Sequence, residues 1–234
     1  IIASSSSSSS HVPSLLRISR TKVCIVMSTP TPTPTSIGKA KLSFVEIKPL
    51  PDPQYGVPCT RSSHGISMVR GGTRLVLYGG EHVARTPLVL AYEQQALWMA
   101  NLDADNNTWQ WKCCIPEATQ KSMPPPRVAH TQVAVNDKDV YVFGGRAGIT
   151  MDEQPMNDLW KLDTETVEWT LIEASGGSAP SPRSFHRMAA TVADDHGTSS
   201  LYIFGGCSAD GRLADLYQFD LTTNTWHDLG ASPL

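Results

Sequence analysis

The sequence has few aromatic residues, few charges and no long apolar run. Aromatic residues make up 7% and charged residues 18% of its 234 residues, and the longest apolar stretches are short runs such as 23–27 and 87–91. A helix that crosses a bilayer needs about 18 consecutive apolar residues. The chain does contain 17 glycines and 17 prolines, a loop-rich composition that is more typical of all-β proteins than of helical bundles. We therefore expect a soluble all-β protein with no membrane partner.

Cysteine is also scarce and is not arranged for disulfides or zinc. The chain has five cysteines, an odd number without Cys-x-x-Cys spacing: Cys24, Cys59, Cys113, Cys114 and Cys207. The neighbouring pair Cys113 and Cys114 cannot form an ordinary disulfide without strain. This pattern favours reduced thiols and a cytoplasmic location.

Broad positive charge is absent from most of the chain. The net charge is −3, but residues 1–45 hold five basic side chains and no acidic one, which leaves 14 basic and 22 acidic side chains in residues 46–234. No run of lysine and arginine alternates with aromatic residues. An acidic body of this kind lacks the cationic surface that phosphate backbones require, so we expect no nucleic-acid partner.

The first 40 residues have a low-complexity composition. Seven serines occupy 4–10, basic residues follow, and Thr-Pro repeats fill 29–36. Residues 1–26 fit an organelle transit peptide, or they are a non-native or mistranslated leader before Met27, and both interpretations stay open. Proline removes backbone donors and favours extended, solvated chain. We predict a disordered Ser/Thr/Pro-rich leader over 1–40 and a folded region over 41–234.

An internal repeat dominates the folded region. The pattern Pro-x-x-Arg-x-x-His occurs three times, and each copy is followed by an apolar run that ends in a glycine pair. The arginines and histidines are Arg61 and His64, Arg127 and His130, and Arg183 and His186; the pairs are Gly79–Gly80, Gly144–Gly145 and Gly205–Gly206. Each copy thus predicts a first strand after the histidine and a second strand that ends at the glycines.

Two more strands are predicted in each copy. An alternating segment (96–102, 158–162 or 215–219) leads through a polar turn to a tryptophan, namely Trp109, Trp169 or Trp226. The copies cover about 58–115, 124–174 and 180–230. A four-stranded unit of this size cannot bury both of its faces alone, so the units must stack on one another.

The glycine pairs, the aromatic spacing and the terminal tryptophans resemble the kelch-repeat family over residues 42–230. This resemblance implies four-stranded β-propeller blades. In such blades the glycines permit positive φ and a close approach of the next blade, and each buried indole stabilises the fold.

The repeats are too few for a closed ring. Propellers need about four to eight blades, whereas this sequence supplies three, plus an N-terminal segment over 42–47 whose Phe44 is spaced like a fourth-strand aromatic residue. In closed propellers such a strand commonly completes the last blade. We therefore expect a fragment of a larger propeller, or a chain that closes only by self-association.

Candidate binding residues lie in the loops after the glycine pairs. Counting strand reversals places these loops on the same face as the repeated arginines, and loops on a rigid scaffold commonly carry recognition. The candidates are Glu81, His82, Arg85, Arg146, Asp210 and Arg212. A protein or peptide is the expected partner.

The repeated arginines and histidines recur in every copy, which favours a structural role. Three histidines on adjacent strands could alternatively face a channel and bind a metal. Arg146 occurs in one copy only, where the other copies have Glu81 and Cys207. It is a candidate anion-binding residue or a solvated loop residue, and Cys207 is predicted to pack rather than to act as a nucleophile.

Segments 61–66, 79–81, 144–146 and 183–186 also resemble plant specifier proteins, kelch propellers that direct glucosinolate breakdown toward nitriles. This resemblance implies an Fe(II)-dependent, lyase-like activity on a sulfated ligand, with Arg146 and, as a weaker match, Arg212 holding the sulfate. It also implies iron ligands from a later blade, so we expect no cofactor or metal ligand in this chain. The adaptor and the enzyme hypotheses both stay open, and a copper-radical oxidase is a more distant third, because its Tyr and His ligand set is missing.

Overall fold

The computed structural model describes residues 47–91, 95–116, 120, 122–148, 154–191 and 199–231. Apart from one 3-10 turn at Arg70–Gly72, the regular elements there are strands. The predicted disordered leader over 1–40 lies outside the described residues, as does most of the expected closing strand. The all-β prediction is confirmed.

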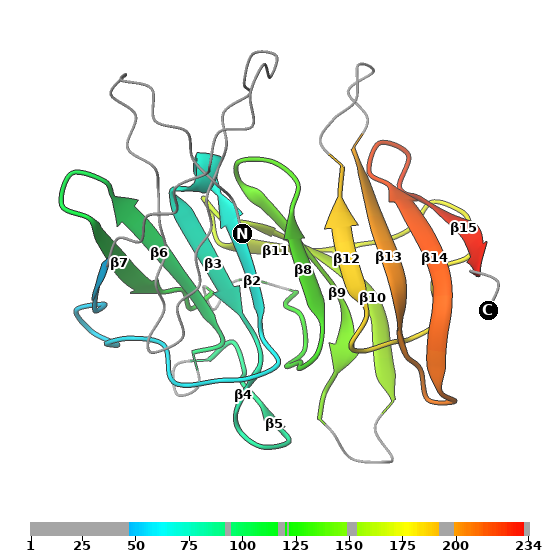
Figure 1. The fold of residues 1–234 in the computed structure, drawn as a ribbon, viewed down its shortest axis with the longest axis horizontal. Coiled ribbons are helices and arrows are strands. Elements are labelled where there is room, and N and C mark those ends of the chain that lie inside the picture. Colours follow the sequence, from blue (N-terminus) through cyan, green and yellow to red (C-terminus); the bar gives the residue numbers. More distant parts are fainter. Residues whose placement is uncertain are drawn as a thin grey trace, which may run out of the picture.

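Three sheets follow one another along the chain, each with a blade of four antiparallel strands, and the first sheet has a fifth strand, β1 (Lys48–Leu50), at its edge (Figure 1). The first blade contains β2 (Gly65–Val69), β3 (Arg74–Tyr78), β6 (Leu97–Asp103) and β7 (Thr108–Cys113). The second contains β8 (Thr131–Ala134), β9 (Asp139–Arg146), β10 (Pro155–Asp163) and β11 (Glu168–Ile172). The third contains β12 (Arg187–Ala190), β13 (Ser200–Cys207), β14 (Arg212–Asp220) and β15 (Thr225–Ala231). The kelch-type blade architecture is thereby confirmed.

The blades stand side by side with their first strands adjacent: β2 contacts β8, and β8 contacts β12. Each blade runs from its first strand on the inside of the array to its fourth on the outside. All second strands therefore end on one face, which we call the glycine-pair face and which lies at the bottom of Figure 1. The opposite face carries the turns between strands one and two and between strands three and four, and we call it the turn face.

One detail of the second strands differs from the prediction. In the first blade the strand ends at Tyr78, before the glycine pair, as expected. In the other two blades the second strand stays paired with the third through the glycines and ends at Arg146 or Cys207. The register shifts between Met156 and Leu159 of β10 in the second blade, and between Phe204 and Gly206 of β13 in the third. Positive φ at both glycines allows the strand to bend there without losing its partner.

Packing between blades forms most of the core. Val76, Tyr78 and Met99 of the first blade meet Val142 and Trp169 of the second in one buried cluster. Phe143 and Leu159 of the second blade meet the third in another. The two junctions repeat the same aromatic contact, because the ring centroids of Tyr78 and Trp169 lie 4.8 Å apart and those of Phe143 and Trp226 lie 5.6 Å apart. Trp169 and Trp226 thus each pack on the blade that precedes their own.

The N-terminal described segment covers the other face of the first blade. Ile47 and Tyr55 pack against Trp98 and Trp109, and β1 (Lys48–Leu50) pairs in parallel with β7. The linker into the third blade repeats this arrangement, since Gly176 forms a parallel bridge with Thr225 at the start of β15. A linker therefore pairs with the first residues of β7 and of β15, the outer strands of the first and third blades. This pairing protects those strand edges from pairing with other chains.

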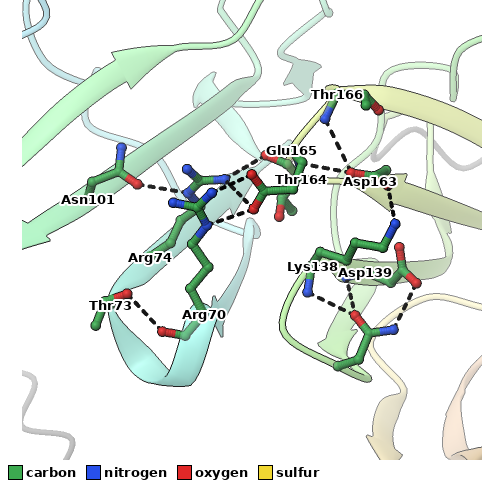
Figure 2. Close-up of polar contacts among 11 residues, drawn as sticks. Arg70, Thr73, Arg74, Asn101, Lys138, Asp139, Asp163, Thr164, Glu165 and Thr166 are labelled. Atoms are coloured by element: carbon green, nitrogen blue, oxygen red, sulfur yellow. Dashed lines mark hydrogen bonds and ion pairs between the residues drawn. The ribbon is translucent and has the colours of Figure 1, made fainter.

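The turn face carries a network of charges that joins the first two blades (Figure 2). Arg70 and Arg74, from the first blade, both contact the Glu165 carboxylate of the second, with 2.7 Å from Arg70 Nε and 3.2 Å from Arg74 Nη1. Arg74 also donates to the Thr164 carbonyl at 2.8 Å. Beside this cluster, Lys138 Nζ lies 2.9 Å from Asp163. The turn face is thus built from polar groups that satisfy one another.

A search of the described residues found no helix of the length and apolarity that a membrane span requires.

Candidate functional site

The glycine-pair face brings together the segments that the sequence singled out. The chain before each first strand pairs with the residues after the glycine pair of the same blade, through the bridges Ser62–Glu81, Val128–Arg146 and Ser184–Cys207. In the first blade the loop beyond Glu81 forms a hairpin from β4 (Glu81–Val83) and β5 (Thr86–Pro87), which projects from this face (Figure 1). Every predicted loop candidate therefore lies on one face.

This face also carries exposed apolar side chains. Eight large apolar residues of the described chain are exposed: Val57, Ile66, Val83, Met123, Leu171, Phe185, Phe204 and Leu229. Four of them, Val57, Val83, Met123 and Phe185, lie in the loops and the hairpin of this face, and the other four lie within blade strands. Within the described residues the turn face has no such side chain.

Two of the repeated arginines are fully buried and hold a carboxylate. Arg127 forms two hydrogen bonds with Asp158, at 2.9 and 2.7 Å, and donates to the Gly144 carbonyl at 2.9 Å. Arg183 repeats these contacts with Asp215, at 2.6 and 2.8 Å, and with Gly205 at 3.1 Å. Burial would raise the pKa of Asp158, but the hydrogen bonds and charge of Arg127 hold it below its usual value. In the second and third blades this ion pair links the segment before the first strand to the third strand.

Arg61 occupies the same place in the first blade without a carboxylate. Ala96 stands where the other blades have aspartate, and the guanidinium donates instead to the carbonyls of Gly79, Ala96 and Gln95 at 3.1–3.3 Å. Its Nη2 also lies 3.4 Å from Cys59 Sγ. Burial without a carboxylate lowers the pKa of Arg61. The repeated arginine thus has a carboxylate partner in the second and third blades and carbonyl and thiol partners in the first.

Two of the histidines pack against the preceding blade rather than converging on one point. A methyl group added at Gly79 would lie 2.7 Å from the His130 ring, and one at Gly144 would lie 2.9 Å from the His186 ring. Burial, reinforced by the neighbouring arginines, lowers the pKa of His186 to about 3 and holds that of His130 well below its usual range. His64, which has no described blade before it, is exposed.

Arg146 reaches across the junction between the second and third blades. Its Nε donates to Ser184 Oγ at 2.7 Å, and its Nη2 lies 3.4 Å from the Ser208 carbonyl. Next to Ser184, Phe185 is 51% exposed with a left-handed backbone, φ 57°. Arg212 is exposed and pairs with Cys207 in the adjacent strands. These residues lie at one place on the glycine-pair face.

The first-blade candidates form a separate group around the β4–β5 hairpin. Glu81 accepts a hydrogen bond from the Arg85 backbone at 2.6 Å, and His82 Nδ1 lies 2.7 Å from the Thr60 carbonyl. Arg85 itself has φ 65° and is exposed. These contacts hold the hairpin in shape, and its exposed Val83 projects beside them.

No cluster with the donors of a metal site is present among the residues that the structure describes. Two thiols of the first blade, Cys113 and Cys114, are buried, and burial raises the pKa of Cys113 to about 12 and that of Cys114 to about 11. Thiols with such values are protonated near neutral pH and are poor nucleophiles.

Sequence reasoning missed the acidic partners of the arginines and the aromatic residue next to His186. Asp158 and Asp215 each stand two residues before an aromatic residue of the third strand, where the first blade has Ala96 before Trp98. Aligning the third strands of the three repeats would have revealed the pair. Phe185 would have stood out in the same way against Ser63 and Ala129.

Comparison with known proteins agrees with this architecture. Residues 47–233 match the family model described as the KLHDC2/KLHL20/DRC7 Kelch-repeats domain. The chain is 31% identical to Host cell factor 2 of Homo sapiens over 188 residues, which cover 76% of this chain and 22% of that protein. It is 36% identical to Adagio protein 3 of Arabidopsis thaliana over 166 residues, 69% of this chain and 23% of that protein.

A third relative, Kelch domain-containing protein 1 of Mus musculus, is 35% identical over 147 residues, which cover 61% of this chain and 33% of that protein. The chain therefore spans between about a fifth and a third of the length of these relatives. The resemblance to plant specifier proteins stays a prediction. This chain is a member of the kelch-repeat family, as its repeated arginines, glycine pairs and tryptophans, its three four-stranded blades and the family model together show.

Proposed function

We propose that this chain is a protein-interaction scaffold that binds a protein or peptide partner through its glycine-pair face. The observation that carries the proposal is the asymmetry between the two faces. The glycine-pair face presents four exposed large apolar side chains outside the blade strands, Val57, Val83, Met123 and Phe185, whereas the turn face carries a network of paired charges. Exposed apolar groups beside arginines are typical of binding surfaces.

The scaffold supports such a role physically. The backbone of the glycine-pair face is fixed by the buried pairs of Arg127 with Asp158 and Arg183 with Asp215. Side chains on a rigid backbone lose little additional freedom when they bind, so more of the contact energy appears as affinity. The loops that carry Glu81, His82, Arg85, Arg146 and Arg212 are the parts that vary between blades.

The proposal can be tested by comparing the partners that two variants capture. The double variant Val83→Ser and Phe185→Ala removes apolar groups from the glycine-pair face, and Glu165→Gln alters the turn face. A specific partner should be captured by the wild type and by Glu165→Gln but lost by the double variant. Equal capture by all three proteins, or loss only with Glu165→Gln, would contradict the proposal.

No contact among the described residues specifically favours the specifier-type lyase. The partners found for Arg146 are a serine hydroxyl and a backbone carbonyl, which are equally compatible with a peptide ligand. A cytoplasmic location and the lack of a cofactor in this chain stay predictions.

A further inference from the structure

The junction between the second and third blades carries a side chain in a costly conformation. The residue before each repeated histidine has a left-handed backbone: φ is 56° at Ser63, 54° at Ala129 and 57° at Phe185. This conformation is uncommon for residues other than glycine, asparagine and aspartate, and it is a marked outlier for a bulky side chain. The backbone repeats in all three blades, but only the third places an aromatic ring there.

Phe185 cannot relax into another backbone conformation. Its amide donates to the Ala129 carbonyl at 2.9 Å, and the preceding Ser184 exchanges two hydrogen bonds with Cys207, at 3.0 and 2.8 Å. The ring is nevertheless 51% exposed, whereas Ala129 is 7% exposed. Strained residues that the surrounding structure holds in place tend to occur at functional sites. The ring is therefore fixed on the surface without being used in the core.

Arg146 lies beside this ring with its charge uncompensated by a described carboxylate. Its Nε donates to Ser184 Oγ at 2.7 Å, which fixes the guanidinium next to the residue that precedes Phe185. No ion pair between described residues includes Arg146 or Arg212, in contrast to the buried pairs of Arg127 and Arg183. Of the described acidic residues at this face, Asp158 and Asp215 are paired with Arg127 and Arg183. Glu81 and Asp210 belong to the β4–β5 hairpin and to the turn that Ser208 closes.

We propose that Phe185 and Arg146, assisted by Arg212, form a subsite for an acidic peptide segment of the partner. An apolar side chain of the peptide packs on the fixed Phe185 ring, and a neighbouring aspartate or glutamate pairs with Arg146. The sign of the charge selects this occupant, because the arginines are complementary to carboxylates and repel basic segments. The inference rests on the proposed function and narrows it to one junction and one chemistry.

The repeat itself supplies the test variants. Phe185→Ala installs the residue that the second blade has at this position, and Arg146→Glu installs the residue of the first blade, so both changes have precedents in the same backbone. Glu165→Gln is the matched control, since it also removes one charge, but from the opposite turn face. Arg146→Gln is a second, neutral variant in case Arg146→Glu does not fold, and unfolding curves check all four.

The probe is a random peptide library displayed on phage, with its carboxyl end attached, so that only side-chain carboxylates are offered. The wild-type chain should enrich peptides with an acidic residue next to an apolar one. Amidated synthetic copies should bind Phe185→Ala and Arg146→Gln at least about tenfold more weakly, and Glu165→Gln as tightly as wild type. Arg146→Glu should enrich basic peptides instead.

Other outcomes would overturn the inference. If enriched peptides bind Phe185→Ala and Arg146→Gln as tightly as wild type, or bind Glu165→Gln as weakly as these two variants, the subsite is wrong while the scaffold function stands. If the wild type enriches no peptide, the acidic-peptide subsite is also wrong. The scaffold function then depends on the capture experiment above, which does not use these peptides.

Discussion

At the scale of single residues, one repeated arginine meets two electrostatic environments. Arg127 and Arg183 are fully buried opposite aspartates, whereas Arg61 is partly exposed and bonds to carbonyls. A buried guanidinium without a counter-charge is costly, because it has lost its hydration without a compensating charge. The aspartates therefore allow the arginines of the second and third blades to be buried completely.

Asp158→Ala should destabilise the fold strongly, since it leaves Arg127 buried with carbonyl acceptors alone. We expect a loss of about 3 kcal/mol in the free energy of unfolding, measured in urea. Asp105→Ala, in an exposed turn, serves as the control and should change it by less than about 0.5 kcal/mol. A similar small effect at Asp158 would mean that carbonyls suffice for Arg127, as they do for Arg61.

The buried histidines predict a dependence of stability on pH. Burial lowers the pKa of His130 well below its value of about 6.5 in the unfolded chain, so below that pH the unfolded state binds more protons. Stability is then fully present above about pH 6.5 and is lost as the pH falls. His130 alone should cost about 2 kcal/mol at about pH 5.

His130→Phe keeps an aromatic ring between the blades and removes this proton. The difference in unfolding free energy between about pH 7.5 and pH 5 should shrink by about 2 kcal/mol in the variant. His227→Gln, at an exposed position of the third blade, is the control. An unaltered difference in His130→Phe would show that His130 is not buried as a neutral group.

At the scale of the elements, the glycine pairs connect the second strand of one blade to the next blade. The amides of Gly80 and Gly145 donate to the carbonyls of Arg127 and Arg183 at 3.1 and 2.9 Å. From the place of the glycine pairs after the second strand, the sequence predicted positive φ, and all six glycines have it. It did not predict that β9 and β13 continue through them, because that depends on where the third strand bends.

A comparison of two glycines separates backbone strain from contact between blades. Gly144 and Gly205 share φ 62° and the same place in their blades, but a methyl group at Gly144 would lie 2.7 Å from the Arg183 carbonyl. At Gly205 the nearest atom is the Leu213 carbonyl of the same blade, 3.1 Å away. Only Gly144 therefore has the next blade in its way.

Both alanine variants should lose about 1 kcal/mol through left-handed backbone strain. Gly144→Ala should lose about 1–3 kcal/mol more, because the third blade must move. Thermal or urea unfolding of the two variants provides the comparison. Equal losses would indicate that the junction adapts to the methyl group without cost.

At the scale of the whole molecule, the energetic weight of a residue depends on its neighbouring blade. Tyr78, Phe143 and Phe204 occupy the same position in the three blades, just before the glycine pair. Tyr78 and Phe143 are 1% and 0% exposed under the next blade, and Phe204, over which no blade of the described chain lies, is 50% exposed. Stacking therefore determines which copies of the repeat contribute to the core.

Phe143→Ala should cost about 3–5 kcal/mol, because it opens a cavity beside His186 and Trp226. Phe204→Ala should cost less than about 1 kcal/mol in the 234-residue chain, because its side chain is half exposed. Unfolding free energies of the two variants test this directly. A large loss for Phe204→Ala would reveal that the face is covered in solution, and sedimentation would show whether a second copy covers it.

The sequence by itself determined the blade and its repetition. Alternating apolar residues, polar turns, glycine pairs and tryptophans act within about 50 residues, so their spacing predicts four strands and a common face for the loops after the glycines. Tertiary structure decided what each repeated residue does. His130 is buried and His64 exposed, Arg127 is paired and Arg61 is not, and Phe185 is fixed at the surface, because these outcomes depend on contacts between strands and blades that the spacing within one repeat does not encode.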